Sequence, residues 1–105
     1  MPPTIGRTVV YMLKEADAEQ INRRRQHARA HLEEHRTNAN GVMVHVGNEV
    51  HAGDHFPMVI TKLWGADATS LVNGTVFLDG SDTFWATSVG VGAVAGTWAW
   101  PERVA

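Results

Sequence analysis

The chain has 105 residues, 44% apolar and 19% charged, a composition typical of one globular domain and not of a disordered segment. It contains no cysteine, which excludes disulfides, thiolate nucleophiles and zinc sites with cysteine ligands. The net charge is −2, and only the first 40 residues are locally basic, so general nucleic-acid binding is not expected.

The first residues and the hydropathy of the chain indicate a cytoplasmic protein. No apolar run approaches the roughly 18 residues that a membrane span requires. The first four residues are not a basic segment followed by an apolar core, so we expect no signal peptide.

A strand and a long helix are predicted in the first third of the chain. Apolar alternation predicts the strand over residues 4–13. Asp17 then resembles a helix N-cap, with Gln20 three positions later as its capping-box partner. Because residues 17–36 contain no glycine or proline, they predict one helix. Its few apolar positions indicate that most of its surface faces water.

Residues 42–101 alternate short β-prone runs with glycine-rich turns. Residues 56–64 are the most apolar run and predict a central strand. The runs 75–78 and 83–89 flank Asp79-Gly80-Ser81-Asp82, and Asp-Gly at this position is a strong hairpin signal. A last short strand, 97–100, ends before Pro101.

These elements predict a single domain over residues 1–105. Its class is α+β and β-rich, with the helix inserted after the first strand. Five or six short antiparallel strands joined by glycine-rich turns favour a small, SH3-like, partly open barrel.

The hairpin 75–89 carries an aromatic ring on each face, because side chains alternate along a strand. We therefore expect one ring to face solvent or a partner and to offer a stacking surface. The alternative is that these rings form the core and the two aspartates only make the turn. The candidate ligand-binding residues are Phe77, Asp79, Asp82, Phe84, Trp85, Thr87, Ser88, Trp98 and Trp100.

A second candidate is the basic run Arg23-Arg24-Arg25 on the predicted helix, with Arg29 nearby. Guanidinium groups fork onto phosphate oxygens, so this run could bind an anion. The alternative is an ordinary solvated helix face whose arginines are balanced by neighbouring glutamates.

Two groups of histidines are candidate metal sites. His31-Leu32-Glu33-Glu34-His35 matches the inverted zincin pattern, and His27 extends the same helix face. Chance accumulation on a polar helix face is favoured, because the pattern lacks a third ligand and a substrate cleft. The second group consists of His45, His51 and His55 with Glu49 and Asp54. We interpret these histidines as exposed turn residues, so we expect neither a metal nor a cofactor.

Four blocks of the chain resemble a family of small tailed-phage accessory proteins, of the kind found in actinobacteriophages. The blocks are residues 6–11, 56–64, 76–89 and 96–102, and the last two match the signature VFLDGxDTFWATSV…GTWxWP. The resemblance implies a phage protein made in the host bacterial cytoplasm, and it implies no catalytic residue. Compact β-rich phage proteins of this size include oligomeric sponges that sequester nucleotide immune signals.

The sequence therefore leads us to expect a non-enzymatic, homo-oligomeric protein that binds a small anionic ligand, such as a cyclic nucleotide or a cyclic ADP-ribose isomer. The base would stack on Trp85, Phe84 or Trp98, and the phosphates would meet the arginine run. The alternative is a protein-interaction or virion-associated module that uses the barrel edge. A zinc hydrolase built on His31 and His35 is a third hypothesis.

Overall fold

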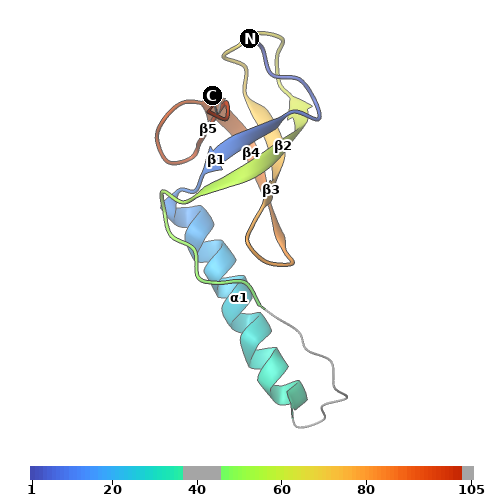
Figure 1. The fold of residues 1–105 in the computed structure, drawn as a ribbon, viewed down its shortest axis with the longest axis vertical. Coiled ribbons are helices and arrows are strands. Elements are labelled where there is room, and N and C mark those ends of the chain that lie inside the picture. Colours follow the sequence, from blue (N-terminus) through green and yellow to red (C-terminus); the bar gives the residue numbers. More distant parts are fainter. Residues whose placement is uncertain (37–45, 103–105) are drawn as a thin grey trace.

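The computed structural model describes residues 1–36 and 46–102, and among them the side chains of residues 1–31 and 46–102. The described elements form a small barrel, from which one long helix extends (Figure 1). In chain order they are β1 (Thr8–Met12), α1 (Glu15–Arg36), β2 (His55–Leu63), β3 (Val72–Phe77), β4 (Thr83–Val91) and β5 (Thr97–Ala99).

The barrel is closed by the short strand β5. Strands β1 to β4 form an antiparallel meander, and β5 pairs with both of its ends. It runs antiparallel to β1, with Tyr11 opposite Trp98, and parallel to β4, with Val91 opposite Trp98. An odd number of strands cannot alternate all the way round, so one parallel pair is required.

This architecture confirms the predicted small barrel with one helix after the first strand. It differs in two details from the partly open, all-antiparallel barrel that the sequence suggested: the barrel is closed, and the β4–β5 pair is parallel. The sequence predicted a strand at 97–100 but not that it pairs on both sides, because a three-residue strand carries almost no periodic signal.

The core is centred on Trp98, whose ring has no exposed area. It meets Trp100 edge to face, with ring centroids 5.2 Å apart and planes at 87°. The Trp98 indole nitrogen is buried without a hydrogen-bond partner among the described residues, which costs on the order of 1–3 kcal/mol. The other fully buried large side chains are Val9, Leu13, Ile21, Met58, Ile60, Val72 and Val76.

Helix α1 begins two residues earlier than predicted. Its N-cap is Lys14, whose carbonyl accepts the Ala18 N–H at 3.1 Å. Asp17 occupies the third helical position instead, and its carboxylate accepts the Lys14 backbone N–H at 3.2 Å. Asp17 is thus the acidic partner of a capping box and not its N-cap. Sequence reasoning shifted the box because lysine is an uncommon N-cap residue.

Among the α1 side chains that the structure describes, residues 15–31, those packed on the barrel lie in the first part of the helix. Ala18, Ile21 and Arg25 are buried, whereas each of residues 26–31 is exposed. The helix continues away from the barrel, and the molecule measures 54 × 29 × 24 Å (Figure 1).

The segment before β2 differs from the prediction. The β-prone runs predicted from residue 42 onward begin in residues 42–45, which lie outside the described part, and residues 46–54 contain no strand. This segment lies against α1, where the Asn22 side chain donates to the Val50 carbonyl at 2.7 Å and accepts the Val50 N–H at 2.9 Å. One amide side chain thus satisfies both backbone groups that a neighbouring strand would otherwise pair.

Candidate functional site

The turn of the β3–β4 hairpin is joined to α1 by a cluster of Arg24, Arg25 and Asp82, which we call the arginine–aspartate cluster. Arg25 is 3% exposed. Its Nε and Nη2 donate to the two carboxylate oxygens of Asp82, at 3.2 and 2.9 Å. Its remaining donors reach the backbone carbonyls of Asn48 and Asp79. Each nitrogen of the buried guanidinium therefore donates at least one hydrogen bond inside the protein.

Close packing around Arg25 leaves no room for a side chain at position 47. A Cβ there would lie 2.5 Å from the Asp79 carbonyl oxygen and 2.6 Å from the Arg25 Cζ. Arg29 adds a further contact, since its Nη2 donates to the Gly47 carbonyl at 2.9 Å. The cluster thus holds α1, residues 47–48 and the hairpin turn together.

The hydrogen bond from Arg25 lowers the pKa of Asp82, and a second bond from Arg24 lowers it further, against the opposing effect of burial. Asp79 contributes a backbone carbonyl to Arg25. The guanidinium of Arg25 and the carboxylate of Asp82, two predicted ligand groups, are thus bound to each other within the fold, whereas the ligand role of the exposed Asp79 side chain stays a prediction.

The other two arginines of the run remain accessible. Arg24 is 45% exposed, and its Nη2 donates to Asp82 Oδ2 at 2.9 Å and to the Thr83 carbonyl at 3.0 Å. Arg23 is exposed and has no hydrogen bond or ion pair within the described ranges 1–36 and 46–102. Arg24 thus lies at the start of β4, and only part of its guanidinium is occupied.

The hairpin presents an uncharged aromatic outer face, which we define as Val59, Thr75, Phe77, Thr83, Trp85 and Thr87. Trp85 is 67% exposed and lies opposite Thr75, and Phe77 is 47% exposed and lies opposite Thr83. Val59 continues the row on β2, opposite Thr75. The expectation that one hairpin face leaves rings uncovered therefore agrees with these exposures.

The remaining aromatic candidates are less accessible. Phe84 points inward and is buried except where it lines the cleft described below. Trp98 has no exposed area, so its ring is not accessible to a ligand. Trp100 is half-buried between Trp98 and Arg7, whose Cζ lies 5.5 Å from the ring centroid.

Ser88 is exposed and has a left-handed backbone, with φ of 53°. Its N–H donates to the side-chain oxygen of the buried Asn73 at 2.8 Å, and the Trp64 indole N–H donates to the same oxygen at 3.0 Å. Asn73 lies at the register shift between β3 and β4, so the Ser88 conformation belongs to this β-bulge.

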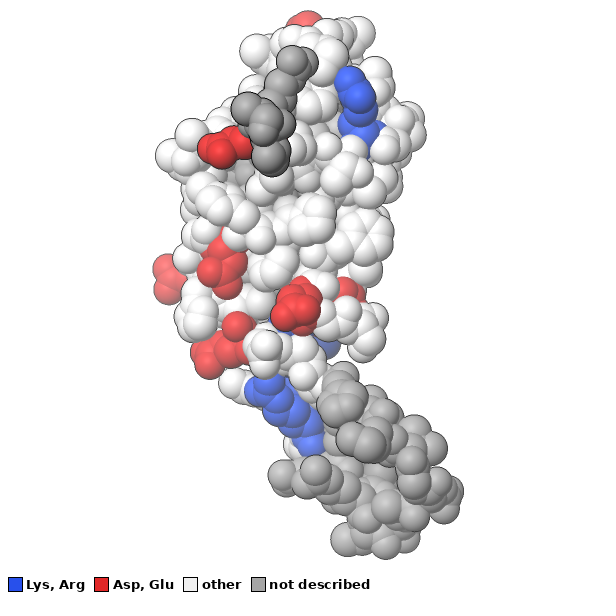
Figure 2. Space-filling model, in the orientation of Figure 1, with Lys and Arg blue, Asp and Glu red and all other residues white. Residues whose placement is uncertain are grey.

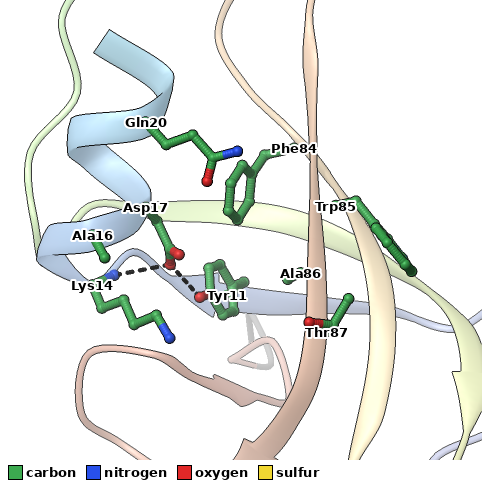
Figure 3. Close-up of a pocket in the computed structure, with 9 residues that line it drawn as sticks. All are labelled: Tyr11, Lys14, Ala16, Asp17, Gln20, Phe84, Trp85, Ala86 and Thr87. Carbon is green, nitrogen blue, oxygen red and sulfur yellow. Dashed lines mark hydrogen bonds between the residues drawn. The ribbon is translucent and has the colours of Figure 1, made fainter. Parts of the chain in front are cut away.

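A polar cleft lies between the first turns of α1 and strand β4 (Figure 3). It encloses about 280 Å³. At its base the Tyr11 hydroxyl donates to Asp17 Oδ2. Burial raises the pKa of Tyr11 well above its ordinary value, and the hydrogen bond and charge of Asp17 raise it further. The lining residues are Tyr11, Lys14, Ala16, Asp17, Gln20, Phe84, Trp85, Ala86 and Thr87.

Three groups on the cleft walls are available to a ligand. The Lys14 ammonium, the Gln20 amide and the Thr87 hydroxyl have no hydrogen-bond or ion-pair partner in the described part of the chain. Of the cleft residues, sequence reasoning named Phe84, Trp85 and Thr87 as ligand candidates but missed the α1 wall, because the two walls come from segments far apart in the chain. The capping-box pattern that includes Gln20 signals a helix start and not a binding site.

The histidines give no metal centre in the part of the chain that is described. No group of three or more histidine, aspartate or glutamate side chains could hold a metal ion there. His51 lies 4.0 Å from the carboxylates of Glu49 and Asp54, and all three are solvent-accessible. His31 is exposed, whereas His45 and the side chains of Glu34 and His35 lie outside the described residues.

Charges of both signs are interspersed on the molecular surface. On the face in Figure 2, acidic side chains gather where the barrel meets α1, and basic side chains follow on the helix. No helix among the described residues combines the length and the apolar character needed to cross a membrane.

No protein-family model matches the chain, and no curated protein and no solved structure matches it. The function is therefore argued from the geometry of its own residues.

Proposed function

We propose that this chain is a non-enzymatic binding protein whose site is the aromatic outer face of the β3–β4 hairpin. The observation that carries the proposal is the 67% exposure of Trp85 on the hairpin, beside exposed Phe77. A large ring left in water on a paired strand contributes little to the core, so its exposure favours a role in binding.

The ligand class follows from what borders this face. Thr83 lies two residues before Trp85, about 7 Å along the strand, and its carbonyl binds Arg24. Arg24 donates to Asp82 and to the Thr83 carbonyl through Nη2, which leaves its Nη1 and Nε donors without partners among the described residues. An indole beside a guanidinium favours a flat ring that carries an anionic group, as in a nucleotide.

Local charge supports the same class of ligand. Asp82 is bound by two arginines, so the arginine–aspartate cluster carries one net positive charge. Arg23 adds a second accessible guanidinium on the same stretch of helix. The ligand residues that we retain are Trp85, Phe77 and Arg24, with Arg23 nearby.

The biological role that we propose combines this site with the resemblance to phage accessory proteins. The block 76–89, which carries much of that resemblance, also contains Phe77 and Trp85. The chain would sequester a nucleotide immune signal in the host cytoplasm, as a homo-oligomer.

Isothermal titration of the whole chain against cyclic mononucleotides, cyclic dinucleotides and cyclic ADP-ribose isomers tests this function. We expect heat with at least one compound, and Trp85→Ala to weaken that binding about 5- to 150-fold, as the loss of one stacked base predicts. Val94→Ala, at an equally exposed apolar position in the β4–β5 connection, is the matched control. Flat heats across the whole panel would remove the ligand proposal.

A second function is favoured by the neutrality of the aromatic outer face, which joins Phe77, Trp85 and Val59 without a charged residue. Such a face suits a protein partner, as in a virion-associated module. Mass spectrometry of purified virions distinguishes the two functions, because a sequestering protein stays in the lysate.

A further inference from the structure

Strand β4 has an unpaired edge along most of its length. It pairs with β3 from Thr83 to Val89, but with β5 only at Gly90 and Val91. In the described structure, no strand lies along the other side of β4 between residues 83 and 89. Helix α1 lies beside this edge, with Arg24 bound at Thr83 and the cleft farther along the strand.

The direction of the backbone groups on this edge follows from Arg24. The Thr83 carbonyl accepts Arg24, so it points toward α1. Because backbone groups alternate sides along a strand, the N–H and C=O of Trp85 and Thr87 also point into the cleft. Those of Phe84 and Ala86 point toward their β3 partners, Val76 and Gly74. Figure 3 is consistent with this direction of the backbone groups. The Trp85 side chain points away from the ring of Tyr11, although Trp85 lines the cleft.

We propose that this cleft binds an extended peptide, which adds as a strand to the free edge of β4. Four backbone groups, two donors and two acceptors, are available to it at Trp85 and Thr87. Added strands obtain their affinity from such main-chain hydrogen bonds. The inference rests on the backbone of β4 and does not depend on the ligand proposed for the aromatic outer face.

The dimensions of the two walls agree with this occupant. Lys14 and Arg24 are ten residues apart on α1, about 15 Å along the helix axis. Thr83 to Thr87 spans about 13 Å of strand. A peptide of about four extended residues therefore fits between the Arg24–Thr83 contact and Lys14.

The charge at the Lys14 end selects a peptide with a carboxylate. Asp17 is occupied by the Tyr11 hydroxyl and by the Lys14 backbone N–H. No carboxylate lies within 4 Å of the Lys14 ammonium in the described structure, so its charge is uncompensated. The C-terminal carboxylate of the peptide binds there, and the exposed Gln20 amide provides a further donor.

The experiment follows backbone amides of the isotope-labelled whole chain by NMR while a peptide of alternating threonine and valine with a free C-terminus is added. We expect the Trp85 and Thr87 amide resonances to shift most, and their hydrogen exchange to slow. The same peptide with an amidated C-terminus should bind about tenfold more weakly, since one charge-assisted hydrogen bond is lost. Unchanged Trp85 and Thr87 amides at millimolar peptide would overturn the proposal.

A pair of variants at one position separates backbone pairing from side-chain contact. Thr87→Pro removes the N–H that faces the cleft, whereas Thr87→Ala keeps it. We expect Thr87→Pro to bind the peptide about tenfold more weakly than Thr87→Ala. Equal affinities in two folded variants would contradict the inference, and if Thr87→Pro does not fold, the wild-type amide shifts decide.

Phe77→Ala distinguishes this inference from the proposed function. Phe77 lies on the aromatic outer face and not in the cleft, so its truncation should weaken a nucleotide and leave peptide binding unchanged. Loss of both would show one shared surface and would contradict a separate peptide site.

Discussion

The sequence joined arginines and aromatic rings into one ligand site, yet the two groups meet the β3–β4 hairpin at different places and in different ways. At the turn, Arg25 of α1 is 3% exposed and donates to the Asp82 carboxylate and the Asp79 carbonyl. In the middle, Trp85 is 67% exposed and its ring faces solvent. The difference shows that the charged group has become structural while the apolar ring has remained available.

Burial explains this reversal. A guanidinium in the interior must have its charge and donors satisfied by the protein, which leaves nothing for a ligand. An exposed indole loses the free energy of burial, and the fold gains no contact in return. The following predictions test this contrast, beginning with the largest expected effect.

Removing the buried guanidinium should destabilise the protein strongly. Arg25→Met removes the donor of the Asn48 and Asp79 carbonyls and leaves Asp82 with Arg24 alone, so we expect a loss of about 3 kcal/mol in the free energy of unfolding. Urea denaturation measures it. Arg23→Met is the matched control and should change stability by at most about 0.5 kcal/mol. Equal losses in both variants would refute the structural role of Arg25.

The hydrogen bond between Tyr11 and Asp17 should make stability depend on alkaline pH. Because the pKa of Tyr11 is raised in the folded state, its contribution is complete below about pH 10 and is lost as pH rises through the folded pKa. The chain contains one tyrosine, so tyrosinate absorbance reports on Tyr11 alone. We expect this absorbance to appear together with unfolding.

Tyr11→Phe is the control for that measurement. It should cost about 1–3 kcal/mol at neutral pH, because Asp17 loses its partner. Its stability should then change less than that of the wild type above pH 10. A wild-type protein that ionises its tyrosine while still folded would contradict the buried hydrogen bond.

Acid should weaken the arginine–aspartate cluster. The pKa of Asp82 is lowered in the folded state, so its contribution is present above the ordinary aspartate pKa, near 4, and is lost as pH falls through the folded pKa. Urea denaturation at pH 7 and pH 3 should show a larger loss for the wild type than for Asp82→Asn. The same loss in both proteins would assign the acid sensitivity to other carboxylates.

The smallest effect on stability is expected on the aromatic outer face. Phe77→Thr should change the free energy of unfolding by at most about 0.5 kcal/mol, because the ring already lies half in water. Thermal unfolding of this variant beside the buried Phe84→Ala, which should lose about 3 kcal/mol or more, tests the distinction. A large loss in Phe77→Thr would assign that ring to the core.

Local patterns predicted the elements that local physics decides. The Asp79-Gly80 turn, the alternation along β4 and the long glycine-free helix each carry a short-range signal, and each element is present. What the sequence did not reveal depends on distant partners. Arg25 is buried only because Asp82 and Asn48 meet it, and Lys14 forms a cleft wall only because β4 lies opposite.

The exposed ring of Trp85 and the buried ring of Phe84 illustrate the same limit. Alternation places them on opposite faces, but the sequence does not specify which face turns inward. That choice depends on barrel closure, and the predicted strand 97–100 did not reveal closure because its pattern does not show that it pairs with both β1 and β4.

The position of β5 also has a consequence for biosynthesis. A ribosome must release residues 97–99 before β1 and β4 can be joined, so these two strands leave the exit tunnel without the neighbour that closes the barrel. The nascent chain therefore exposes two unpaired strand edges until β5 emerges, and closure of the barrel depends on contacts between residues far apart in the chain.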